Sequence, residues 1–288
     1  MTTTLTSRAL RLGIERARLE LRAVTRDVNR LFIEFHIVNI ALFVLLALLL
    51  GDRTPSVPGG VSQVAALTVT FMLISIAQLG VVSVAQAVIV SRDDGTLLRL
   101  RCTPGGLRVF VTEKIAYVVT IGVVVLGALT VSGVALTDLP LPASPGRWAT
   151  LFAVAALGLA TTAVIGALLG AVLPDARESL GYSVLPIFLL VLISGMNPAE
   201  RLPDWVNRVL DVLPFNWMAR GLRSALMPDA MAALETAGSW QRPLAFAVLA
   251  GWAAAGALVT VPLLRRMTLQ ASGSDLARRR ERAEARYR

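Results

Sequence analysis

The chain has 288 residues, of which 55% are hydrophobic and only 16% are charged, and its mean hydropathy is +0.67. A soluble domain would carry about 25% charged residues. The apolar residues stand in long blocks, each close to the ~20 residues that cross the ~30 Å hydrocarbon core of a bilayer. The composition excludes an ordinary soluble protein and predicts an all-α integral membrane protein.

The net charge of +9 comes from 28 Lys+Arg against 19 Asp+Glu. A basic soluble protein would suggest a nucleic-acid partner. Here the arginines lie mainly in connections and tails, where membrane topology and anionic lipid headgroups account for them, so we expect no nucleic acid. The single cysteine, Cys102, and the single histidine, His36, exclude an intramolecular disulfide, a Cys-only metal cage and a two-histidine metal site.

Six apolar blocks predict six membrane-spanning helices, separated by turn-forming residues such as Pro104, Gly105 and Gly106. Three parts follow: a cytoplasmic interfacial helix over 1–30, a transmembrane domain over 31–264, and a basic cytoplasmic tail over 265–288. The predicted spans cover approximately 31–50, 64–90, 109–136, 148–173, 180–196 and 243–264.

Arginine placement predicts the orientation of these spans. Arginines are concentrated before the first span, in the second and fourth connections and in the tail, so both termini are predicted to be cytoplasmic. Four of the five tryptophans fall on the opposite side, where an outer aromatic belt is expected. The Arg-rich, Lys-poor and Ala-rich composition is typical of a high-GC bacterium, so the expected location is the bacterial inner membrane.

The N-terminal segment has the pattern of a basic amphipathic helix. Arg18, Arg22 and Arg26 lie opposite an apolar stripe about 100° wide, which predicts a helix in the plane of the membrane interface. A two-stranded coiled coil is the alternative, and the arginine-rich face makes it the weaker one. The stripe comprises Leu10, Ile14, Ala17, Leu21, Val24, Val28 and Leu31.

Motifs for catalysis are absent from the sequence. There is no H-E-x-x-H and no G-x-S-x-G, and the only lysine, Lys114, does not stand in a Walker A loop. We therefore expect no enzymatic activity, no metal and no ATP site in this chain. Ion-coupled transport is also disfavoured, because the central parts of most spans carry no ionisable residue. For Lys114, snorkelling to the interface is favoured over a pair with Glu34.

The second predicted span carries a polar stripe. Thr68, Ser75, Gln78 and Gln86 fall within an arc of about 80° at ideal helical spacing. They indicate either the wall of a substrate path or hydrogen bonds between helices, and the second interpretation is slightly favoured. In the fourth span, Gly166 and Gly170 form a GxxxG motif, which predicts close approach of another helix.

The connection after the second span resembles the signature loop of type-2 ABC exporter permeases. That loop has an acidic residue, then Gly-Thr-Leu, a further leucine and Thr/Ser-Pro, and here Asp94 replaces the usual glutamate. The glycine and the proline predict a short leucine-bearing helix that forms a compact knob. The matching residues are Asp94, Gly95, Thr96, Leu97, Leu100, Thr103 and Pro104.

A second stretch resembles the region after the fifth span of the same family. It contains Ser194-Gly195, Leu202-Pro203-Asp204-Trp205, Pro214 and Leu222-Arg223. The resemblance implies an outer re-entrant helical segment over 195–240. Met196-Asn197 departs from the aromatic residues that the family commonly has after Ser-Gly, which leaves gate and substrate preference open.

The resemblance implies the permease subunit of an ATP-driven exporter, similar to daunorubicin-resistance and polysaccharide exporters. Two permeases, identical or not, would pair and bind separate ATPase subunits that hold ATP and magnesium. The sequence does not choose among drugs, lipids, glycolipids and polysaccharides as cargo. The alternative is a non-transporting membrane scaffold or accessory subunit of an envelope complex, in which the loop would tolerate substitution.

Two residue sets carry these expectations. The coupling loop, residues 91–108, would dock on the ATPase with Leu97 and Leu100 as anchors, and the path between two permease copies would be lined by the second and fifth helices. The coupling residues are Asp93, Asp94, Gly95, Thr96, Leu97, Arg99, Leu100, Thr103 and Pro104, and the path residues are Ser75, Gln78, Gln86, Tyr182, Ser183 and Pro186.

Overall fold

The computed structural model describes residues 2–27, 36–50, 56–103, 105–173, 178–196, 203–235 and 237–270. Within these ranges every regular element is a helix. The helices are α1 (Thr2–Arg26), α3 (Ile37–Leu50), α4 (Gln63–Ala77), the π-helix η2 (Gln78–Ser83), α5 (Val84–Asp93), α6 (Thr96–Arg101), α7 (Gly106–Leu136), α8 (Pro145–Val172), α9 (Glu178–Met196), α10 (Asp204–Val212), α11 (Pro214–Leu226), the 3-10 helix η4 (Asp229–Leu234) and α12 (Arg242–Gln270).

Local sequence explains where the long helices begin. The Ser62 side chain accepts a hydrogen bond from the backbone N–H of Ala65 and so caps α4. Ser144 caps α8 in the same way, and Pro145 follows at the first helical position, where its missing N–H costs nothing.

Four helical segments are long and apolar enough to cross a membrane, which confirms the predicted helical membrane class. They are Gln63–Asp93, Val109–Leu136, Pro145–Val172 and Arg242–Thr260. The first and fifth predicted spans coincide with shorter apolar helices, Ile37–Leu50 and Leu185–Gly195. The predicted first span begins in residues 31–35, and most of the predicted tail falls in 271–288; both lie outside the described residues. Six spans therefore remain a prediction.

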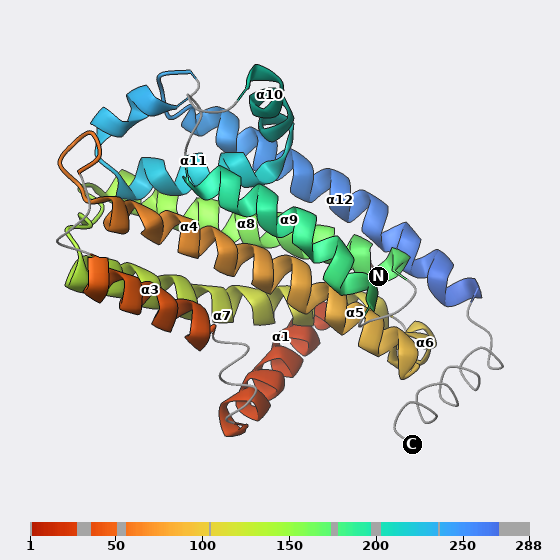
Figure 1. The fold of residues 1–288 in the computed structure, drawn as a ribbon. Helices are drawn as coiled ribbons and strands as arrows, with labels where there is room; N and C mark the ends of the chain where they lie inside the picture. The colour runs from red at the N-terminus through yellow and green to blue at the C-terminus, as the bar shows by residue number, and fades with distance from the viewer. Residues whose placement is uncertain are drawn as a thin grey trace.

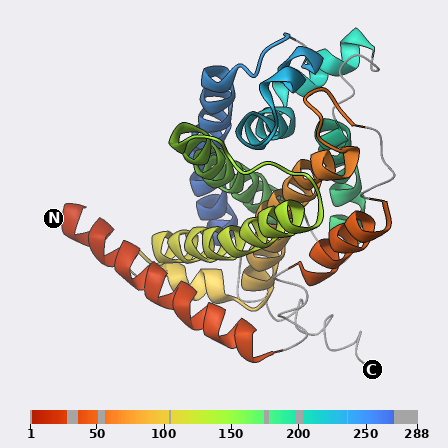
Figure 2. The same cartoon turned by 90° about the vertical axis from the view of Figure 1, so that its left-hand side faces the viewer.

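The helices form one bundle, in which α4, η2 and α5 make a single continuous rod (Figure 1). At one end of the rod lies α6, and α1 lies across the outside of the bundle against α7 (Figures 1 and 2). Helix α11 packs against α4, α8, α9 and α12, and all of its residues are buried. The chain thus has a core helix of only 13 residues, too short to span a bilayer.

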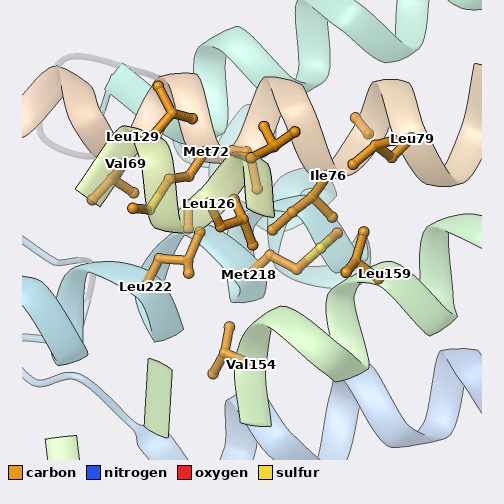
Figure 3. Packing of buried hydrophobic residues seen from close by; sticks show 14 of the residues in the cluster. Val69, Met72, Ile76, Leu79, Leu126, Leu129, Val154, Leu159, Met218 and Leu222 are labelled. Atoms are coloured by element: carbon orange, nitrogen blue, oxygen red, sulfur yellow. The ribbon is translucent and has the colours of Figure 1, made fainter. Parts of the chain in front are cut away.

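The core forms where the rod meets α7, α8 and α11. Figure 3 shows Met72 and Ile76 of α4 beside Leu126 of α7, with Met218 of α11 reaching toward Leu159 of α8. All of these side chains are buried, as expected for helices that pack their apolar faces against one another.

Glycines allow α8 to approach the rod closely. A Cβ at Gly166 would clash with the carbonyl oxygens of Gly80 and Val81, and one at Gly170 would lie 2.7 Å from the carbonyl oxygen of Ala85. The close approach predicted from the GxxxG motif is therefore confirmed, with η2 and α5 as the partner surface.

The π-helix corrects the predicted polar stripe. Ideal helical spacing was assumed along the whole span, but a π-helix takes up an extra residue and shifts the residues beyond it by about 100°. Thr68 and Ser75 are buried, whereas Gln86, which follows the π-helix, is exposed. Gln78 is also exposed, but it starts the π-helix and already lay at the edge of the predicted arc. The residues do not form one continuous stripe.

Candidate functional site

The connection between α5 and α7 forms the knob that the sequence predicts. Gly95 has φ of 76°, a left-handed conformation that favours glycine, and it starts α6. The Asp94 carboxylate accepts a hydrogen bond of 2.8 Å from the backbone N–H of Thr96. At the other end, the Thr103 hydroxyl donates to the carbonyl oxygen of Leu100, also at 2.8 Å. We call residues 92–103 the α6 knob.

Two of the three leucines of the α6 knob point inward. Leu97 is only 1% exposed and belongs to the chain's own core, and Leu100 packs partly against that core. The Leu97 side chain therefore packs within the chain and holds the knob in place, and its docking on an ATPase stays a prediction. The exposed residues of the knob are Asp94, Arg99, Cys102 and Thr103.

Polar contacts also fix the α6 knob to the bundle. Arg92 donates from Nη1 to the carbonyl oxygen of Leu173 at the end of α8, at 2.8 Å, and lies 3.3 Å from the Asp93 carboxylate. Of the predicted coupling residues, Pro104 lies outside the described residues. The knob is thus held by α8 through Arg92 and by the core through Leu97.

Helix α1 packs on α7 and contributes charges to the same end of the bundle. Lys114 Nζ lies 2.7 Å from the Glu20 carboxylate, and Arg16 lies 3.6 Å from Glu113. The ammonium of Lys114 is thus paired with α1, and its snorkelling to the membrane interface stays a prediction. Glu34, the alternative partner, lies outside the described residues. Arg18, Arg22 and Arg26 are exposed on α1.

The contact of α1 with α7 uses small side chains from the predicted apolar stripe. Ala17 and Val24 are buried, and a Cβ at Gly13 would lie 2.6 Å from Thr112 Cβ. Part of the stripe therefore faces α7 of the same chain, while Ile14 remains 38% exposed. The predicted position at the membrane interface stays a prediction.

A polar pocket of about 390 Å³ lies beside the α6 knob, between α1, α5, α6 and α7. Two basic and two acidic side chains face each other around it, so the pocket is close to electrically balanced. Its charged side chains are paired with one another, Lys114 with Glu20 and Arg16 with Glu113. The lining residues are Arg16, Leu19, Glu20, Ser91, Thr96, Phe110, Glu113 and Lys114.

The predicted path residues are distributed unevenly. Gln78 lines a pocket of about 320 Å³ between the rod and α9, whose other lining residues are apolar, among them Ile187 and Phe188. Ser75 is buried and accepts a hydrogen bond of 2.7 Å from Asn39 of α3, as the interpretation by contacts between helices predicted. Gln86 and Pro186 are exposed, and the side chains of Tyr182 and Ser183 lie outside the described part of the chain.

The opposite end of the bundle contains charged residues to which the sequence analysis assigned no role. Arg220 and Arg223 of α11 are buried against Glu235, which follows η4. Their spacing of three residues places both on one face of α11, and this spacing is the feature of the sequence that could have identified them as a pair. In the described ranges, no group of three or more His, Cys, Asp or Glu side chains could hold a metal ion.

Comparison with known families gives one result. A family model described as "ABC-2 family transporter protein" matches residues 36–260, which run from the start of α3 into α12 and include the α6 knob and α11. No curated protein matches the chain significantly.

Proposed function

The chain belongs to the ABC-2 transporter family, a family of multi-pass membrane subunits, and we propose that it is the permease of an ATP-driven exporter. ATP and magnesium would be held by ATPase subunits on separate chains. The observation that carries this proposal is the α6 knob. It is fixed inwardly by Leu97 and Arg92 and presents Asp94, Arg99 and Thr103 outward.

The knob lies where a partner's movement would reach the path. Because α5, η2 and α4 form one rod, a displacement of the knob would shift the wall that carries Gln78. The Lys114–Glu20 pair would move α1 together with α7. Docking of the ATPase would therefore act on both sides of the polar pocket at once.

The proposed path lies between two permease copies, identical or paralogous. It would be lined by the rod and α9, with Gln78, Gln86, Tyr182, Ser183 and Pro186 as path residues. Helices α3 and α9 carry large exposed apolar side chains, including Val38 at 73% and Leu185 at 60%, which supports burial against lipid or a second copy.

The proposed topology has six spans, with both termini in the cytoplasm of a bacterium and the membrane around the spans being its inner membrane. α3 and α9 would be the two further spans beside the four longer ones. α10 and α11 would form the outer re-entrant segment, which the short length and full burial of α11 support. A non-transporting scaffold has no observation in its favour beyond the absence of catalytic motifs.

Purification from the native membrane tests the proposal first. A tagged chain extracted in mild detergent should retain a P-loop ATPase subunit and vanadate-sensitive ATPase activity. A folded preparation that retains neither would refute the permease proposal.

Substitution of Asp94 tests the role of the knob. Asp94→Arg should lower ATPase retention by about tenfold or more, because a charge reversal at a docking surface repels the partner. Asp94→Asn keeps an acceptor for the Thr96 N–H and should fold normally, which separates charge from capping. Asp204→Arg, an exposed reversal on α10, is the matched control and should retain the subunit.

A further inference from the structure

The buried charges of α11 form a closed cluster. Arg223 Nε donates to Glu235 Oε1 at 2.7 Å, and Arg220 Nε lies 3.2 Å from Glu235 Oε2. Arg220 also donates from Nη2 to Asp211 at 2.9 Å. The Arg223 and Glu235 side chains are only 3% and 1% exposed. Two guanidinium groups and two carboxylates therefore neutralise one another, with Glu235 buried and the Asp211 side chain 36% exposed.

Arg223 uses a second nitrogen, Nη1, on another helix. Its Nη1 donates to the carbonyl oxygen of Ser194 at 3.0 Å and lies 3.4 Å from that of Gly195. Both residues belong to the last turn of α9, which ends at Met196. Carbonyls in a last turn have no partner within their own helix, and the negative end of the helix dipole lies there. A cation placed at this point stabilises the helix end.

The last turn of α9 also packs closely on α4. A Cβ at Gly195 would lie 2.8 Å from Cγ2 and 3.0 Å from Cα of Thr70. The turn is thus confined by α4 on one side and held by Arg223 of α11 on the other. Its position depends on a side chain whose own orientation is fixed by Glu235.

We propose that Arg223 is a positioning residue for the end of α9, oriented by Glu235. This proposal rests on the proposed function only in one respect: if α9 lines the export path, Arg223 fixes the end of that wall nearest α10 and α11. The positioning of the α9 end by Arg223 does not depend on the proposed function. A buried ion pair contributes little net stability compared with apolar side chains of similar volume, so fixing a position is the specific effect that the pair can supply.

Hydrogen–deuterium exchange of the full-length chain in lipid nanodiscs tests this. In Arg223→Met/Glu235→Met the cluster stays neutral, because Arg220 keeps Asp211 and Gln241 as partners. Amides in the last turn of α9 should exchange about tenfold faster, because that turn loses its charged donor and opens locally more often. Exchange in α8 should stay within about twofold of wild type.

Two further variants make the result decisive. Asp211→Asn alters the same cluster without touching α9, so it should leave the last turn of α9 unchanged. Arg223→Lys keeps the charge beside Glu235 but lacks the planar fork that reaches Glu235 and α9 together, and it replaces the double variant if that variant does not fold. Unchanged exchange at the end of α9 in a folded double variant, or in Arg223→Lys when the double variant is unfolded, would overturn the proposal.

The ATPase and export assays separate this proposal from the proposed function. Faster exchange at the end of α9 supports the positioning role even where the wild-type chain retains no ATPase. Loss of export in a double variant that still retains its ATPase subunit would extend the role to the path.

Discussion

The two ends of the bundle hold their charges in different surroundings. At the end formed by α11, Arg223 and Glu235 are almost completely buried. At the end formed by α6, the side chains of Lys114 and Glu20 are 15% and 29% exposed, and that of Arg16 is 47% exposed. Both ends pair opposite charges, but only one of them excludes water from the pair.

The difference bears on what each end can do. A dry pair has one good arrangement, because either charge without its partner is strongly disfavoured in a low-dielectric interior. A hydrated pair can separate at small cost, because water screens the charges. The α11 end is therefore suited to hold a fixed geometry, and the α6 end is suited to adjust against a partner.

The largest effect is expected at Glu235. Glu235→Ala leaves two buried guanidinium groups short of a carboxylate and should lower the free energy of unfolding by about 3–5 kcal/mol. Unfolding by sodium dodecyl sulfate in mixed micelles measures this. Arg223→Met/Glu235→Met should lose far less, because no charge is left without a partner. Equal losses in the two variants would mean that packing, not charge, dominates this end.

A smaller effect is expected at Lys114. Lys114→Met keeps much of the apolar stem but removes the ammonium from Glu20, and should cost about 1 kcal/mol, since the pair is partly hydrated. The same unfolding assay measures it. Arg11→Ala is the control, because its pair with Glu15 is exposed on α1 and should contribute less than about 0.5 kcal/mol. A loss at Lys114 as large as at Glu235 would remove the contrast between the ends.

The smallest effect is a pH dependence at Asp229. A hydrogen bond from the Trp240 indole, together with the Arg147 guanidinium, lowers the pKa of this carboxyl below its ordinary value. Its stabilising contribution is therefore present above the unfolded pKa of about 3.9 and is lost as the pH falls through the lower folded value. Because the side chain is largely exposed, the loss should be slight. The difference between the wild type and Asp229→Asn should disappear at acid pH; a difference that grows instead would contradict the assignment.

The sequence was sufficient for features that depend on local pattern. Apolar blocks located the long helices, and the Asp94-Gly95-Thr96 pattern located the knob, because capping and a left-handed glycine are determined within a few residues. The GxxxG motif likewise required only spacing to predict a close helix contact.

Features that depend on distant residues were not predictable. Nothing in the local sequence shows that the arginines of α11 are buried, because Asp211 and Glu235, which pair with them, lie on other segments. Leu97 could be assigned to a partner because nothing local reveals that its own core covers it. Lys114 has its partner in Glu20, 94 residues away. Each of these features concerns which surfaces meet, and not which segments are helical.

The π-helix η2 has a consequence for the evolution and engineering of the rod. A turn that accommodates an additional residue keeps α4 and α5 in register with their own neighbours, so the insertion is absorbed locally. Deleting one residue within Gln78–Ser83 should therefore join α4 and α5 into a regular α-helix and leave the α6 knob in place. α8 has no π-helical turn that could absorb the same deletion. A residue deleted there would turn Gly166 and Gly170 away from the rod by about 100°.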